Sequence, residues 1–297
     1  MELPKTVTFI GKSAFRSCSD LASVTILGDV SYFGEYAFAY CNNLENVTIS
    51  GSTTTIGENA FDGCGRLKTV VLSNSITSIS GYAFEGCSSL EIINIPANVV
   101  SIGEYSFRKS GLTSITIPSK VTSIGQGAFG ECQKLERIEV SSGNQQYQSI
   151  YGVLTDKVDN ILVQYPAGKS GHYTIPSNIT SIGDSAFQGC YQLTSVTIPN
   201  SVSSIGHYAF DFCDELTSIT IPSSVSSIGN SAFLDCNNLQ SITFLSNVSS
   251  IGNSAFSGCD GLESIIYLGT TTPTCLSSAI PSTPLRHVCV PPGYSQL

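Results

Sequence analysis

The sequence is poor in charged residues and lacks features that several classes of protein require. Only 12% of its 297 residues are charged and 41% are hydrophobic, whereas disordered chains combine low hydrophobicity with high charge. No hydrophobic run is close to the length of a membrane span, which needs about 20 residues. The first residues contain no apolar signal-peptide stretch and run directly into the repeated pattern described below. We therefore expect the native N-terminus, with any signal peptide, to lie outside this sequence.

Positive charge is scarce, especially in the second half of the chain. Residues 1–169 hold 12 Lys and Arg against 15 acids, whereas residues 170–297 hold only Arg286 against seven acids. Nucleic-acid binding needs clustered cations that displace the counterions of phosphates, so this class of function is excluded. The acidic surface favours solubility, and attraction of a basic partner is the alternative.

The pattern of cysteine and histidine predicts no enzyme and no metal or cofactor site. The eleven cysteines include no C-x-x-C pair, which zinc sites typically need. The three histidines, His172, His207 and His287, are scattered along the chain and give no sign of a Ser-His-Asp arrangement. Most cysteines are predicted to be buried, where a free thiol behaves as a small hydrophobic group.

What the sequence has in abundance is an internal repeat of about 23 residues. Its template is φ-x-x-I-G-x-x-A-F-x-x-C-x-x-L-x-x-φ-x-φ, where φ is Val or Ile. Cys follows Phe by three residues in nine of ten copies, and Ser110 replaces it in the fifth copy, which has 22 residues. A fixed period of this length indicates a solenoid, in which stacked turns bury one another's apolar side chains. The repeated phenylalanines are Phe15, Phe38, Phe61, Phe84, Phe107, Phe129, Phe187, Phe210, Phe233 and Phe256.

A single repeat can be interpreted physically. Alternating Ile219 and Ile221 predict a half-buried strand, with Ser218 and Thr220 pointing outward. The Gly that follows Ile in nine of ten copies predicts a tight corner where a Cβ is disfavoured. The segment that ends at Cys, such as 231–236, is long enough for about one helical turn.

The form SIGxxAFxxCxxLxSIxIP, present over residues 6–268, resembles the BspA-like, or Treponema pallidum type, leucine-rich repeats. This resemblance implies an α/β-type leucine-rich-repeat solenoid with a parallel β-sheet on its concave face. It also implies short strands and helical turns on the other side, and a secreted or cell-surface protein of a bacterium or a parasitic protist.

We predict one continuous solenoid with repeats at 1–140 and 173–268. The segment 141–172 is predicted to be a β-hairpin insertion, in which 151–155 and 160–166 flank a polar turn. The hairpin is either a recognition element or a structural patch. Residues 269–297 are predicted to form a C-terminal cap with a strand at 286–290, and Cys275 and Cys289 are candidates for a disulfide.

Most outward positions of the predicted strands are small hydroxyl residues, and a few other side chains interrupt them. Binding energy concentrates in apolar and Arg anchors, so a ligand would contact these interruptions and the hydroxyls beside them. The candidate contact residues are Val71, Ile92, Asn94, Thr116, Arg137, Glu139, Thr197, Thr220 and Ile266.

The resemblance implies a non-enzymatic protein-interaction module. It implies an adhesin-like protein, extracellular or at a cell surface, whose partner is a host matrix or cell-surface protein. Two alternatives stay open at this stage. One is a structural, self-assembling rod, and the other is a binder of a repetitive polysaccharide surface through the hydroxyl rows.

Overall fold

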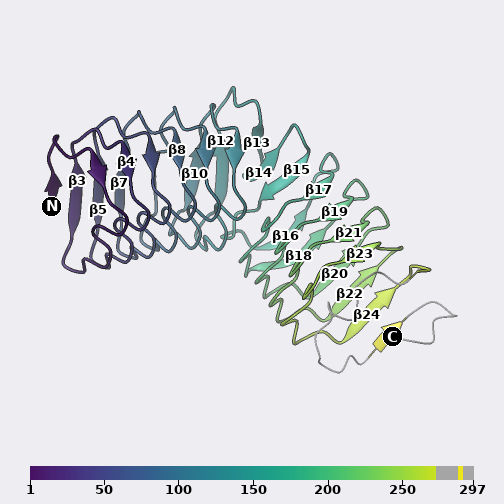
Figure 1. Cartoon of the computed structure of the whole chain (residues 1–297). Coiled ribbons are helices and arrows are strands. Elements are labelled where there is room, and N and C mark those ends of the chain that lie inside the picture. Colours follow the sequence, from purple (N-terminus) through teal and green to yellow (C-terminus); the bar gives the residue numbers. More distant parts are fainter. Residues whose placement is uncertain (272–286, 290–297) are drawn as a thin grey trace. The chain divides into compact units, whose positions relative to one another are not determined.

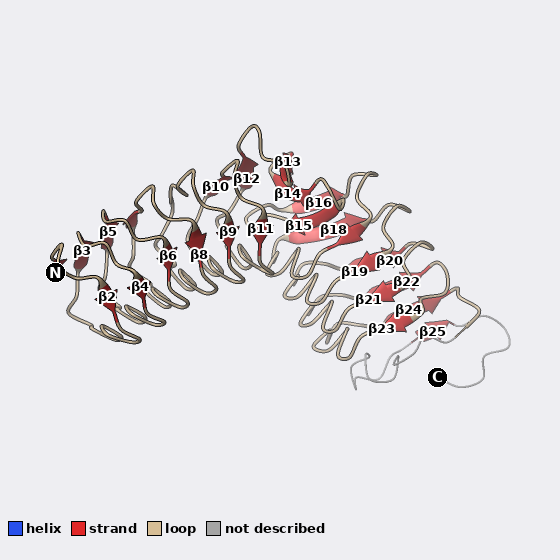
Figure 2. Cartoon of the chain, turned by 45° about the horizontal axis from the view of Figure 1, so that its top comes forward, coloured by secondary structure: helices blue, strands red, loops and turns tan. Residues whose placement is uncertain are grey.

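The structure is a computed structural model of the whole chain, and it describes residues 1–271 and 287–289 (Figure 1). The chain forms two compact units, residues 1–158 and residues 159–297. Every regular element in the described residues is a short β-strand (Figure 2). Each unit is a stack of turns of about 23 residues, and most turns contribute strands to two rows.

In the first unit, the strands of both rows pair in parallel with the strands of neighbouring turns. The first row consists of β1 (Glu2–Leu3), β3 (Ser23–Ile26), β5 (Asn46–Ile49), β7 (Thr69–Val71), β10 (Ser114–Ile117) and β12 (Arg137–Val140). The second row consists of β2 (Phe9–Ile10), β4 (Tyr32–Phe33), β6 (Thr55–Ile56), β8 (Ser78–Ile79), β9 (Ser101–Ile102) and β11 (Ser123–Ile124).

The second unit repeats this arrangement with parallel pairing in both rows. Its first row consists of β16 (Gly171–Thr174), β18 (Leu193–Thr197), β20 (Ser218–Ile221), β22 (Ser241–Phe244), β24 (Ser264–Tyr267) and β25 (His287–Cys289). Its second row consists of β15 (Ile161–Gln164), β17 (Ser181–Ile182), β19 (Ser204–Ile205), β21 (Ser227–Ile228) and β23 (Ser250–Ile251).

The core contains a column of phenylalanines, as the repeat predicted. From the second turn on, each Phe of the template is fully buried. Rings of successive turns stack with centroids 4.7–5.7 Å apart within each unit. Stacking of identical side chains is possible because parallel, in-register turns place the same residue type at the same height.

The cysteines form a second column beside the phenylalanines. Of the nine cysteines whose side chains the structure describes, eight are buried and Cys18 is exposed, and all nine are free. Their thiols also have a polar partner, since most donate to the carbonyl of the Phe one turn earlier, as Cys236 does to Phe210 O at 3.0 Å. Burial raises the pKa of Cys132 to about 11, so this thiol stays protonated at neutral pH.

The predicted helical turns are absent from the residues that the structure describes, so the α/β description is not supported. The segment around Phe210 shows why. The backbone N–H of Phe210 donates to Ala232 O of the next turn at 2.7 Å, while Asp211 N–H donates to Tyr208 O within its own turn at 3.2 Å. Tyr208 and Phe212 have φ values of 53° and 56°. A helix needs every N–H to bond within its own segment, whereas here alternate N–H groups join neighbouring turns.

The repeated glycine excludes a Cβ, as predicted, but the cause is contact between turns. A Cβ on Gly229 would lie 2.5 Å from Gly206 C, and one on Gly103 would lie 2.3 Å from Gly81 N. Neither glycine has a positive φ. Glycine is therefore required because the backbones of successive turns approach closely at this corner.

The hairpin lies earlier in the insertion than predicted. Strands β13 (Tyr147–Ile150) and β14 (Val153–Asp156) pair antiparallel. Tyr151 and Gly152 connect them with φ values of 53° and 83°, the left-handed conformation of a type I′ turn. The segment predicted as the second hairpin strand instead contains β15, which pairs in parallel with β17.

Part of the predicted insertion is a degenerate repeat turn. Tyr165 takes the place of the template Phe, since its N–H donates to Ala186 O at 2.7 Å and its ring centroid lies 5.1 Å from that of Phe187. The repeats of the second unit thus begin before residue 173. At the other end, β25 confirms the predicted strand at 286–290, with its bounds at His287–Cys289. The rest of the predicted cap and the Cys275–Cys289 pair lie outside the described residues.

Candidate functional site

Side chains of the first strand row alternate between buried and outward positions, and the outward ones form the candidate binding face. In β20, for example, Ile219 and Ile221 are buried while Ser218 and Thr220 are exposed. In the second unit this face consists mainly of hydroxyl residues. Thr197 and Thr220 line one shallow hollow there, and Ile266 is half-buried between Thr243 of β22 and β25.

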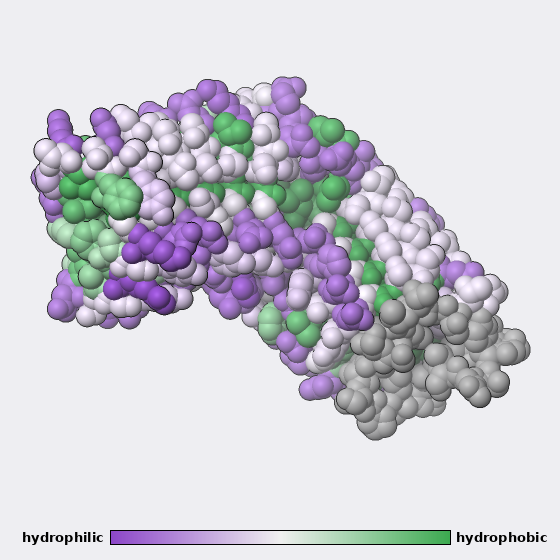
Figure 3. All heavy atoms as spheres, viewed as in Figure 1, coloured by the Kyte–Doolittle hydropathy of each residue, from purple (hydrophilic) through white to green (hydrophobic). Residues whose placement is uncertain are grey.

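The first unit brings six of the predicted contact residues onto one face. Val71 is 50% exposed and Ile92 is 66% exposed, both high values for large apolar side chains. Thr116 of β10 lies opposite Glu139 of β12, and Asn94 is exposed beside Ile92. Arg137 is also exposed, and its Nε lies 3.9 Å from Glu139 Oε1, a loose surface ion pair. Figure 3 shows a band of apolar atoms among the hydrophilic atoms of the first unit.

The first strand row of this unit is interrupted in the fourth turn. Sequence patterning predicts a strand through residues 92–95, yet this segment is not a strand, and the ladder ends at β7 and resumes at β10. Within the described residues, no backbone hydrogen bond is made by Ile92–Ile95. The N–H and C=O groups of these four residues are therefore open, whereas other turns use theirs for the ladder.

The interruption coincides with a missing residue in the fifth turn. The template places Leu three residues after Cys, but Leu112 follows Ser110 by only two. The shortened connection contacts the fourth turn, because Gly111 N–H donates to Cys87 O at 3.2 Å. Because the connection is short, Lys134 of the sixth turn reaches past the fifth turn and pairs with Glu91 at 3.0 Å.

Two hollows lie on either side of Ile92 as a result. One has a volume of about 350 Å³, and we name it the Ile92 groove; its lining is Ile92, Ile93, Asn94, Ile95, Ala97, Ser114, Ile115, Thr116, Pro118, Ser119 and Ser141. The other, of about 480 Å³, is lined by Lys68, Ser88, Ser89, Glu91, Ile92 and Lys134. The sequence signal for both was the short Ser110–Leu112 spacing.

The hairpin adds one further residue to this face. Tyr151 at its tip is 90% exposed. The neighbouring Gly152 accepts a hydrogen bond from Ile138 N–H at 2.8 Å, and a Cβ on Gly152 would meet Arg137 Cβ at 2.9 Å. The tip thus lies against β12, beside Arg137. Sequence analysis missed Tyr151, although the Tyr-Gly pair between two apolar segments is a turn signal.

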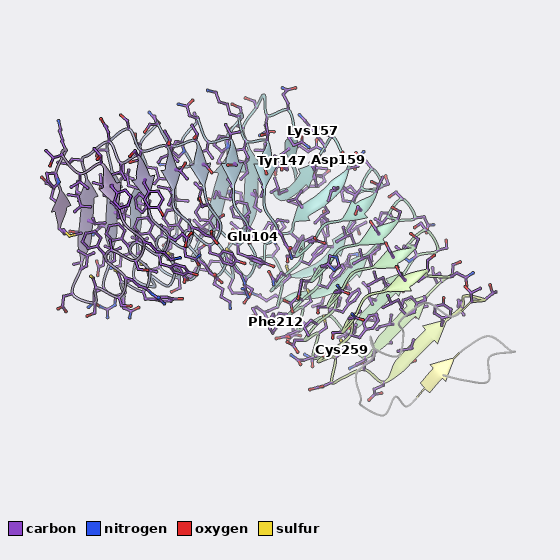
Figure 4. All side chains as sticks on the ribbon, viewed as in Figure 1. Glu104, Tyr147, Lys157, Asp159, Phe212 and Cys259 are labelled. Atoms are coloured by element: carbon purple, nitrogen blue, oxygen red, sulfur yellow. The ribbon has the colours of Figure 1, made fainter. Side chains whose placement is uncertain are left out.

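The base of the hairpin is held firmly, which positions its tip. Asn144 is only 3% exposed, and its side chain donates to Pro118 O and Val121 O at 2.8 and 3.0 Å. Its Oδ1 accepts from the backbone N–H of Tyr147 at 2.7 Å. Lys157 Nζ donates to Asn144 O at 2.6 Å. Figure 4 labels Lys157 and Tyr147 in this part of the first unit. These contacts support the structural role of the hairpin, while the exposed tip supports a role in recognition.

The described residues offer little for catalysis or metal binding. They contain no group of three or more His, Cys, Asp or Glu that could hold a metal ion. His172 Nδ1 lies 2.8 Å from Ser195 Oγ, and its Nε2 lies 3.1 Å from Thr174 Oγ1 and 3.3 Å from Thr197 Oγ1. The imidazole therefore belongs to the hydroxyl rows of the outward face.

Two half-buried charges and one buried charge of the first unit form an ion-pair ladder across three turns. Arg108 bridges Glu85 and the 6%-exposed Glu131 of the two neighbouring turns, and its guanidinium lies 5.3 Å from the ring of Tyr105. Burial raises the pKa of Glu85, and the charge of Arg108 opposes that rise. These charges pair with one another, so the buried Glu131 carboxylate is not left uncompensated.

Stacked turns of about 23 residues with a parallel strand row and an inward Leu, Phe and Cys define a leucine-rich-repeat protein. Comparison with known families identifies the particular family. A model of the BspA type leucine rich repeat region, present in six copies, matches residues 1–110, 54–151 and 167–275. The chain therefore belongs to the BspA-type leucine-rich-repeat family.

Solved structures of bacterial proteins share this fold. A leucine-rich repeat protein from Eubacterium ventriosum matches with a TM-score of 0.77 and 31% identity; the match covers 83% of this chain and 66% of the other. A leucine rich cell surface protein from Faecalibacterium prausnitzii matches with a TM-score of 0.63 and 27% identity, covering 94% and 89%. The pneumococcal vaccine antigen PcpA matches with a TM-score of 0.74 and 21% identity, covering 91% and 78%. No curated protein sequence matches.

These relatives are leucine-rich-repeat proteins, a repeat fold without catalytic function. The part of the chain that the structure describes contains no helix of the length and apolarity that crossing a membrane requires.

Proposed function

We propose that this chain is a non-enzymatic protein-interaction module that acts at a cell surface or outside the cell, as an adhesin-like protein. Its ligand is a host matrix or cell-surface protein. The proposed binding surface is the outward face of the first strand row, the face predicted to be concave. The description of the Faecalibacterium relative as a cell surface protein supports the location.

One observation carries this proposal. In the first unit, large exposed side chains gather on a face that is otherwise made of small hydroxyl residues. Val71, Ile92, Arg137 and Tyr151 lie on it or at its edge. Tyr and Arg are enriched among the residues that supply most of the binding energy in protein interfaces, and the two apolar side chains add surface that binding would remove from water. The strand ladder holds the backbones of Val71 and Arg137 in place, and the Asn144 contacts position the hairpin that carries Tyr151. This lowers the entropy lost on binding.

The test is binding of the purified chain to immobilised fibronectin, fibrinogen, laminin and mucin, measured by surface plasmon resonance. We expect saturable binding to at least one of them. The double variant Arg137→Ala/Glu139→Ala and the variant Tyr151→Ala should each weaken binding about tenfold or more. Lys12→Ala is the matched control, because Lys12 is an exposed cation in the turn that follows β2 and is not part of the first strand row.

The proposal fails if none of the four proteins binds while circular dichroism shows an intact fold. It also fails if the control variant weakens binding as much as the face variants do, since the binding would then follow charge and not this surface.

The hydroxyl rows of the second unit favour a second candidate, binding of a repetitive polysaccharide. Ser218, Ser241 and Ser264 lie in register along β20, β22 and β24, so hydroxyls repeat at the strand spacing of about 4.8 Å. Thr220→Val keeps the shape of the side chain and removes its hydroxyl. Weaker retention of this variant on a polysaccharide column, with matrix-protein binding unchanged, would favour this candidate.

A further inference from the structure

We propose that the Ile92 groove binds an extended, uncharged peptide segment of the partner protein, which pairs with the open backbone of Ile92–Ile95. This inference rests on the proposed function and specifies how the same face would hold its ligand. Three properties of the groove support it: its open backbone groups, the chemistry of its lining, and its origin in the missing residue of the fifth turn.

The open backbone is the first argument. Ile92–Ile95 make no backbone hydrogen bond within the described residues, although they lie between β7 and β10 in a strand row. An extended peptide presents alternating N–H and C=O groups along one edge. It can therefore satisfy a row of such groups as an added strand does, whereas the side chains of a helix or a compact loop cannot.

The lining determines which peptide fits. Buried Ile93 and Ile115 lie beneath the groove, and outward-facing Asn94, Ser114 and Thr116 form its polar rim. None of the residues that line it is charged, so a charged side chain would lose water there without gaining a partner. A volume of about 350 Å³ is at the small end of ligand sites. It accommodates aliphatic side chains of the peptide, with the exposed Ile92 packed against them.

The origin of the groove supplies a specific way to close it. Where the full Cys-x-x-Leu spacing is kept, a strand can join the ladder on both sides, as β22 and β24 do. Changing Ser110→Cys and inserting one serine after Gly111 restores this spacing in the fifth turn. The change should let residues 92–95 rejoin the ladder, which removes both the open backbone and the hollow.

The experiment selects random linear 12-residue peptides displayed on phage against the full chain, with the groove-closed variant for counter-selection. Affinities of the enriched synthetic peptides are then measured by fluorescence polarisation. We expect uncharged, aliphatic-rich peptides that bind at least tenfold more weakly to the groove-closed variant and to Ile92→Asp. Methylation of alternate peptide nitrogens should also weaken binding at least tenfold, because it removes the N–H donors. Lys12→Ala should bind them as the unchanged chain does.

Several results would overturn the inference. They are the absence of any peptide that distinguishes the two chains, enrichment of charged peptides, and affinities unaffected by Ile92→Asp or by N-methylation. Ile92→Asp changes an exposed side chain, so it provides a test even if the inserted residue prevents folding. Matrix-protein binding that needs Arg137 but is unchanged in the groove-closed variant would leave the proposed function standing and refute the groove. Peptide binding to the groove without any matrix-protein binding would leave the groove standing and refute the proposed function.

Discussion

Replacing the corner glycine of one turn by alanine tests how the turns of this solenoid are held together. Gly229 has no positive φ, so alanine can adopt its backbone conformation. However, a Cβ at this position would lie 2.5 Å from both Gly206 C and His207 N of the preceding turn. Gly229 N–H also donates to Ile205 O of that turn at 2.8 Å. The added methyl group must therefore push two hydrogen-bonded turns apart.

The expected cost follows from two opposing terms. Overpacking in a well-packed site costs about 1–3 kcal/mol, and here backbone atoms, which cannot swing away, are the obstacle. Alanine also reduces the conformational entropy of the unfolded chain, which raises the free energy of unfolding by about 0.4–1 kcal/mol. We expect Gly229→Ala to lower the free energy of unfolding by about 2 kcal/mol, which combines these terms.

Gly11→Ala is the matched control for this substitution. Gly11 occupies the same position of the first turn, has no positive φ, and has only Phe9 Cε1, at 3.5 Å, near its missing Cβ. We expect a change within about 0.5 kcal/mol, as for a surface substitution. Gly86→Ala isolates the backbone effect, because Gly86 has a φ of 68° and no atom within 3.4 Å of a Cβ; the left-handed conformation should cost about 1 kcal/mol.

The assay is urea unfolding followed by far-UV circular dichroism, with the slope of each transition checked because repeat arrays can lose two-state cooperativity. Equal losses for Gly229→Ala and Gly11→Ala would refute the reasoning. The glycine would then be required by the corner itself and not by the neighbouring turn.

Two further predictions concern buried polar groups. Arg108→Met should lower the free energy of unfolding by about 3 kcal/mol at pH 7, because it removes the closer of the two cations that pair with the buried Glu131 carboxylate and leaves only the more exposed Lys109, at 3.5 Å. Burial raises the pKa of the neighbouring Glu85, and a carboxyl with a raised pKa in the folded state gains stability as pH falls through that pKa. Part of the loss should therefore be recovered at pH 5 in urea titrations, and a loss that is equal at both pH values would contradict this account. In the second prediction, iodoacetamide should alkylate the exposed Cys18 of the native protein quickly and leave Cys132 unmodified. The reason is that Cys132 is buried and that burial raises its pKa to about 11. Peptide mapping measures the labelling, and equal labelling of the two cysteines would be inconsistent with the buried column.

Much of the fold could be predicted because each feature recurs at a fixed period. The inward Phe and Cys columns, the strand through Ile219 and Ile221, and the outward Ser218 and Thr220 are all found where the repeat predicted them. Identical turns stack in register, so the environment of a residue in one turn is the environment of its equivalents in the others. The exposure of Val71 and Ile92 could be predicted for the same reason.

Other features depend on contacts between turns and carried no local signal. The helical turns do not form because alternate N–H groups, such as that of Phe210, bond across to the next turn. Tyr165 could not be assigned to the Phe column from spacing alone, since its place is set by contact with Phe187.

By itself, the sequence determined a solenoid of about 23-residue turns and which side chains of its first strand row are buried or outward. The reason is that apolar and polar residues recur at fixed positions of the repeat. Only the tertiary structure decided where that row is interrupted. One residue missing before Leu112 changes how the fifth turn lies against the fourth, and the open backbone of Ile92–Ile95 and the groove beside it follow from that stacking. A hydrogen bond between turns needs a donor in one turn and an acceptor at the right distance in the next. The sequence of one turn cannot show whether the neighbouring turn places an acceptor at that distance.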